Sequence, residues 1–94
     1  AYTSLATDVL ARWKRLAGEE VFFLTGTDEH GQKVEKAARD AGMEPQAFTD
    51  GVSQSFRLLA ERMNFSHDDF IRTTEPRHHR ACQALWQALA ARGE

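Results

Sequence analysis

Apolar residues recur at helical spacing in several segments of the chain, and glycine or proline bounds each segment. The spacing predicts one helix over residues 4–17 and a second over 32–41, because Gly18 and Gly42 directly follow them. A longer helix is predicted to begin at Pro45, a residue that suits a first helical position. Its apolar positions step by three or four residues: Phe48, Val52, Phe56, Leu59 and Met63. We expect this stripe to lie in the core.

Two shorter segments have the composition of strands. Residues 21–25 form a continuous apolar, aromatic and β-branched run closed by Gly26, which is typical of a central strand buried on both faces of a parallel sheet. Residues 70–74 form a second candidate strand, and Pro76 then opens a last helix that ends near Gly93. The order helix, strand, helix, helix, strand, helix predicts an α/β fold with parallel strands and flanking helices.

The last helix is expected to bury one apolar face. That face carries Cys82, Leu85, Trp86 and Leu89. The single cysteine cannot form an internal disulfide, so we interpret it as a small core side chain. Trp13 and Trp86 occupy apolar helical positions, where a core role is more common than stacking on a base.

The histidines and arginines also have simple structural interpretations. His78 and His79 are neighbours on a helix and point in different directions, so we expect no shared metal ion. His67 is likewise not expected to bind a metal. Arg72 and Arg77 have the reach to contact a phosphate, but in an acidic chain surface salt bridges are the simpler expectation.

Length and charge narrow the classes of function. The chain has 94 residues, enough for one domain at most, and its net charge of −2 gives no basic surface for holding nucleic acid. The longest apolar run is too short to span a bilayer, and no N-terminal stretch has the order of a signal peptide, so we expect a cytoplasmic location. The chain starts at Ala1 without an initiator Met or a leading strand, and we expect it to be cut inside a domain.

The segment 24–33 is the best candidate for chemistry, because it lies at the carboxyl end of a predicted strand, where open α/β sheets bind ligands. It is not a phosphate-binding P-loop, since Gln32 separates the second glycine from the lysine and the acidic Asp28 and Glu29 oppose an anion. An ammonium group fits better than a metal ion, because Asp28, Glu29 and His30 are adjacent in sequence and adjacent residues rarely converge on one ion. Alternatively, Asp28 caps the next helix and Glu29 is solvated.

The residues of this segment resemble a known family. The stretch from Val21 to Lys33, with the sequence VFFLTGTDEHGQK, is similar to a stretch characteristic of methionyl-tRNA synthetases. Residues 1–3 resemble those immediately after the HIGH motif of class I synthetases, and residues 70–74 with the two adjacent histidines resemble a later strand and helix. The resemblance covers essentially the whole chain.

This resemblance implies that residues 1–94 are part of a Rossmann-type catalytic domain, beginning just after the HIGH motif. The family activates methionine with ATP and Mg²⁺ and then transfers the methionyl group to tRNA(Met). The family's aspartate that contacts the α-ammonium group of methionine falls on Asp28, and a histidine of the same pocket falls on His30. Residues two apart point to the same side of an extended chain, which supports this pairing. The resemblance assigns no role to Glu29 or Lys33.

The resemblance also implies that the chain carries no catalytic residue of its own. The histidines of the HIGH motif would precede Ala1, and the lysine-bearing KMSKS loop would lie beyond Glu94, so the remainder of the catalytic domain is an expected partner. We expect the isolated chain to be inactive and to hold no bound cofactor. Two alternatives remain: a non-enzymatic helical binding module built on residues 32–63, and another class I synthetase or nucleotidyl transferase of the same fold. Neighbouring parallel strands would exclude the first.

Overall fold

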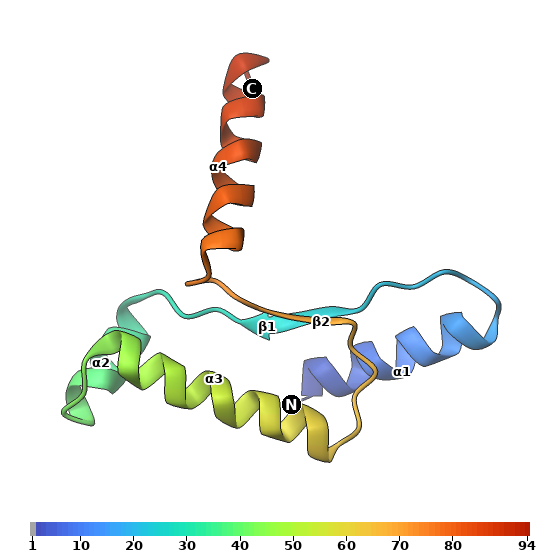
Figure 1. The fold of residues 1–94 in the computed structure, drawn as a ribbon, viewed down its shortest axis with the longest axis horizontal. Helices are drawn as coiled ribbons and strands as arrows, with labels where there is room; N and C mark the ends of the chain where they lie inside the picture. Colours follow the sequence, from blue (N-terminus) through green and yellow to red (C-terminus); the bar gives the residue numbers. More distant parts are fainter. Residues whose placement is uncertain (1) are drawn as a thin grey trace.

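A computed structural model of the chain describes residues 2–94, which form four helices and two strands (Figure 1). The elements are α1 (Tyr2–Leu16), β1 (Leu24–Thr27), α2 (Gln32–Asp40), α3 (Pro45–Arg62), β2 (Asp69–Arg72) and α4 (Pro76–Ala91). All six predicted elements are present in the predicted order. The expectation that the chain is cut inside a domain was drawn from Ala1, which lies outside the described residues.

The two strands are parallel neighbours, so the predicted α/β fold class is confirmed. Leu24 lies opposite Asp69 and Thr27 lies opposite Arg72, and α2 and α3 form the connection between the strands. Gly26 is required at its position, because a Cβ atom there would lie 1.8 Å from the carbonyl oxygen of Ile71. The paired strands exclude the purely helical binding module.

The helix ends follow the predicted chemistry. Gly18 and Gly42 have positive φ angles of 84° and 68° just after α1 and α2, a conformation that glycine adopts without steric cost. Pro45 occupies the first turn of α3, and Pro76 does the same in α4. In Figure 1, α1, α2 and α3 lie on one side of the sheet, whereas α4 projects from the other.

The first strand differs from its prediction in extent and in burial. It begins at Leu24 and not at Val21, because the Asp68 carboxylate accepts a hydrogen bond of 2.6 Å from the Phe23 backbone N–H and takes the place of a strand partner. The prediction of burial on both faces is wrong, since Leu24 is 50% exposed. Within residues 2–94 the sheet has two strands, so one edge of β1 has no strand beside it.

The predicted core is also wrong in part. Val52 and Phe56 on α3 are exposed, as is Met63 just after its end, and the buried positions of the helix are the small or polar Thr49, Ser53 and Ala60. Small residues are buried there because α3 packs closely against α2 and β1. The apolar stripe faces outward beside that contact.

The same correction applies to α4 and α1. None of the residues of α4 is buried, and Cys82, Leu85 and Trp86 are exposed, as is Trp13 on α1. These helices have the amphipathic pattern that predicts a covered face, but no segment of residues 2–94 covers it.

Within residues 2–94, no helix is long and apolar enough to cross a membrane.

The exposed apolar faces and the open edge of β1 predict that the isolated 94-residue chain associates or is only marginally folded. Sedimentation velocity over a range of concentrations, together with thermal melting, measures this directly. We expect oligomers or a broad transition. A compact monomer with a sharp, reversible melt would contradict the prediction.

Candidate functional site

The candidate site lies in the loop that joins β1 to α2, at the carboxyl end of β1. Side-chain exposure alternates along this loop: Asp28 and His30 are exposed, whereas Glu29 between them is only 7% exposed. Gly31, with a φ of 124°, ends the loop and is the N-cap residue of α2. No side-chain hydrogen bond caps α2, so the alternative in which Asp28 caps this helix is wrong.

Asp28 lies at a mainly apolar hollow between β1 and the two helices that follow it. The hollow has a volume of about 220 Å³. Its lining comprises Gly26, Thr27, Asp28, Glu29, Val34, Phe48, Thr49, Val52, Ser53 and Phe56. Three residues of the predicted core stripe, Phe48, Val52 and Phe56, therefore line a cavity and not a packed interior. An apolar hollow with a carboxylate at one end suits a ligand that combines an apolar body with a cationic group.

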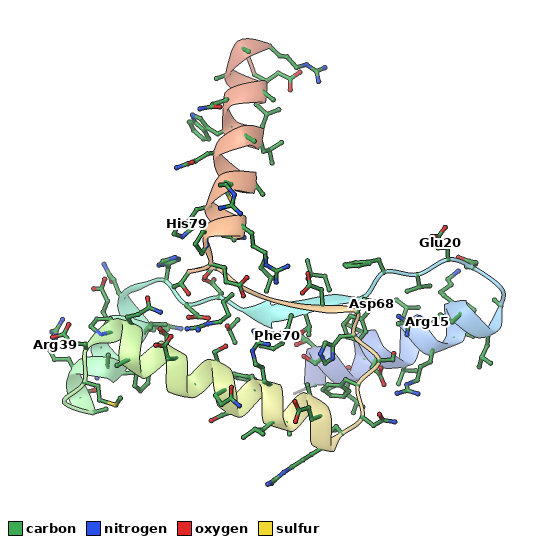
Figure 2. The ribbon with its side chains drawn as sticks, in the orientation of Figure 1. Arg15, Glu20, Arg39, Asp68, Phe70 and His79 are labelled. Atoms are coloured by element: carbon green, nitrogen blue, oxygen red, sulfur yellow. The ribbon has the colours of Figure 1, made fainter. Side chains whose placement is uncertain are left out.

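His30 lies at a smaller, adjacent hollow of about 110 Å³ that also borders Glu29 and Thr74. Its backbone N–H donates a hydrogen bond of 3.4 Å to the Asp28 carboxylate, and its Nε2 atom lies 3.4 Å from the carbonyl oxygen of Thr73. The ring centroid of His79 is 6.3 Å away, and Figure 2 shows His79 at the sheet end of α4. A single pocket shared by Asp28 and His30 stays a prediction, because the two side chains line neighbouring hollows.

Glu29 is the residue whose role the sequence did not reveal. Its carboxylate accepts two hydrogen bonds of 2.7 Å from the guanidinium group of Arg72, one from the Thr27 hydroxyl at 2.6 Å and one from the Thr74 hydroxyl at 3.1 Å. The alternative of a solvated Glu29 is therefore wrong. Arg72 bonds Asp50 as well. A usable signal existed, because Arg72 ends the strand that pairs with the end of β1.

Glu29 and Arg72 hold each other in their charged states. The bidentate hydrogen bond from Arg72 lowers the pKa of Glu29 from 4.5 to about 2, and the threonine hydroxyls add to this while burial opposes it. The pKa of Arg72 is raised in turn, first by Glu29 and then by Asp50. Glu29 is thus a carboxylate near neutral pH, and its charge is neutralised within the chain.

The remaining arginine and histidine side chains singled out in the sequence have structural partners or neighbours within the chain. Arg77 forms salt bridges with Asp69 and Glu75, as expected, whereas Arg72 forms one that is more buried than a surface pair. His67 packs edge-on between Phe23 and Phe70, and His78 lies 3.4 Å from the Cys82 sulfur. In the described part of the chain, no group of three or more His, Cys, Asp or Glu residues has the arrangement of a metal site.

Comparison with known proteins identifies the family to which the chain belongs. A family model described as tRNA synthetases class I (M) matches residues 1–94. The methionine–tRNA ligase of Rickettsia bellii is 63% identical over 93 residues, and that of Mesorhizobium japonicum is 55% identical over 94. The aligned region covers 99% and 100% of this chain, respectively, and 18% of each relative.

A solved structure supports the same assignment. The Mycobacterium tuberculosis methionyl-tRNA synthetase bound by methionyl-adenylate superimposes with a TM-score of 0.90 at 47% identity, over 99% of this chain and 18% of that one. This likeness confirms the expected fold class, part of a Rossmann-type α/β domain. The chain spans about a fifth of the length of the curated relatives it matches. The 94 residues belong to the M-type family of class I tRNA synthetases.

Proposed function

We propose that residues 1–94 are a part of the catalytic domain of a methionine–tRNA ligase, beginning just after its HIGH motif. The whole protein joins methionine to tRNA(Met) in an ATP-dependent reaction, through a methionyl-adenylate. The match of the class I family model to residues 1–94 supports this proposal, as do relatives at 55–63% identity that are named for that activity. The relative from M. tuberculosis was solved with methionyl-adenylate.

The role proposed for this segment is to bind the α-ammonium group of methionine through Asp28. The observation that carries it is the contrast between two adjacent carboxylates. Glu29 is buried and neutralised by Arg72, whereas Asp28 is exposed and, within residues 2–94, its side chain makes only the 3.4 Å contact with the His30 amide. Asp28 therefore has a negative charge free for a ligand, at the sheet edge where α/β folds bind substrates. His30 is proposed to line the same pocket.

The remaining substrates are proposed to bind mainly outside this segment. No described residue is proposed to be catalytic, and ATP, its Mg²⁺ ion and tRNA(Met) require the rest of the protein. A single charged aspartate positions an amino acid, but the phosphates need several cationic or hydrogen-bond donors. We place the whole enzyme in the cytoplasm, without a membrane partner.

Amino-acid-dependent exchange of pyrophosphate into ATP tests the proposed function. A full-length enzyme that contains this sequence should catalyse exchange with methionine and show at least about a hundredfold lower kcat/KM with leucine or isoleucine, since a pocket discriminates side chains of different shape by a few kcal/mol. Exchange that depends on another amino acid, and not on methionine, would assign the chain to a different class I enzyme.

A further inference from the structure

The loop that carries Asp28 is held by three consecutive residues: Arg72, which ends β2, and Thr73 and Thr74 directly after it. The Thr73 N–H donates to the carbonyl oxygen of Thr27 at 3.2 Å, and the Thr73 hydroxyl accepts a hydrogen bond of 2.8 Å from the Glu29 N–H. Arg72 and Thr74, on either side of Thr73, both donate to the Glu29 carboxylate. Backbone and side chain of Glu29 are therefore both fixed from the neighbouring strand.

The burial of Glu29 distinguishes this ion pair from the two that Arg77 forms nearby. The Glu29 side chain is only 3% exposed and that of Arg72 is 20% exposed, whereas the carboxylate side chains of Asp69 and Glu75, which pair with Arg77, are 35% and 26% exposed. A buried ion pair gives little net stability, because removing both charges from water costs about as much as their attraction returns. Its clear physical effect is to fix geometry, since a bidentate pair tolerates one orientation of the two groups.

The fixed geometry acts on Asp28 through the backbone. Exposure alternates along Asp28, Glu29 and His30, so a loop in which Glu29 points inward must present its two neighbours outward. A rotation that released Glu29 from Arg72 would also turn the Asp28 carboxylate away from the apolar hollow. Misplacement of a binding group by about 1 Å is enough to weaken a site substantially.

We propose that Glu29, locked by Arg72 and by residues 73–74, is a positioning residue that sets the direction of the Asp28 carboxylate and thereby the affinity for the ammonium group of methionine. This inference rests on the function proposed above. The Glu29 carboxylate is already paired with Arg72, so its proposed role is to orient Asp28 and not to bind the ammonium group. It acts through Asp28.

The test uses a full-length methionine–tRNA ligase that contains this sequence, with the variants Glu29→Gln and Arg72→Lys. The first keeps the shape of Glu29 but removes its charge, and the second keeps the charge of Arg72 but removes the bidentate fork. Each should raise the KM for methionine about tenfold while the KM for ATP and kcat change less than about twofold, because binding of the ammonium group is weakened equally in the ground state and in the transition state. Asp69→Asn is the matched control, since it breaks a bidentate arginine pair on the same strand. It should leave the methionine KM unchanged.

A double-mutant cycle separates positioning from a general structural effect. In the Asp28→Asn background, Glu29→Gln should raise the methionine KM by less than about twofold, because the group that Glu29 positions is already gone. If Asp28→Asn and Glu29→Gln raise the methionine KM independently, so that their effects multiply in the double variant, the inference is overturned. Equal changes in the KM values of methionine and ATP would overturn it as well. If Asp28→Asn raises the methionine KM and neither Glu29→Gln nor Arg72→Lys does, this inference fails and the proposed function stands. If Asp28→Asn itself has no effect, the proposed ammonium site fails.

Discussion

Asp28→Asn in the full-length enzyme is expected to raise the KM for methionine about ten- to hundredfold, because a charge-assisted hydrogen bond is worth about 1.5–3 kcal/mol. The asparagine retains the shape and one oxygen acceptor but loses the charge that is proposed to face the ammonium group. The KM for ATP should hardly change. Steady-state pyrophosphate exchange at varied methionine and ATP measures both constants.

Asp40→Asn is a suitable control for this experiment. Asp40 is an exposed carboxylate at the end of α2, paired with Lys36, and its substitution makes the same change in net charge away from the site. It should leave both KM values as they are. An Asp28→Asn enzyme with an unchanged methionine KM would remove the ammonium role from this residue.

The elements of the fold could be predicted because the signals that define them are local. Helix α2 begins at the predicted Gln32, and α3 and α4 begin at the predicted Pro45 and Pro76. The start of β1 could not be predicted in this way. It depends on Asp68, a residue 45 positions later whose carboxylate occupies the hydrogen-bonding partner position of Phe23. Such long-range competition leaves no periodic trace in the sequence.

Burial was harder to predict than secondary structure. An amphipathic pattern shows that a helix has an apolar face, but it does not show what covers that face. Phe56 and Trp86 follow the pattern and are exposed, whereas Thr49 and Ser53 break it and are buried. Close packing of α3 against β1 and α2 favours small side chains over large ones at that contact.

The candidate site, too, could be predicted only in part from the sequence. Asp28 and His30 came from the resemblance to a family, and their place after β1 came from the alternation of elements. The role of Glu29 depended on Arg72, which is 43 residues away and reaches Glu29 only because the two strands pair in register. Adjacent acidic residues in a sequence look equivalent, and only their partners separate a ligand-facing charge from a neutralised one.

The isolated 94-residue chain is expected to form no methionyl-adenylate, even with saturating methionine and ATP. The chain contains neither a HIGH nor a KMSKS sequence, so the groups that engage ATP in the family are absent from it. Removing one preorganised charge-stabilising donor costs about a hundred- to thousandfold in rate, and several are missing together, so exchange should fall below detection. The contact proposed between Asp28 and the ammonium group does not replace them.

Pyrophosphate exchange on rigorously purified chain is the measurement, and a preparation carrying Asp28→Asn controls for contaminating full-length enzyme. Contaminant activity does not depend on the substitution in the short chain and varies from one preparation to the next. Activity of the chain itself would scale with its concentration and would fall in the Asp28→Asn preparation. Exchange with both properties would show that part of the phosphate chemistry resides within these residues, in conflict with the assignment of that chemistry to the rest of the protein.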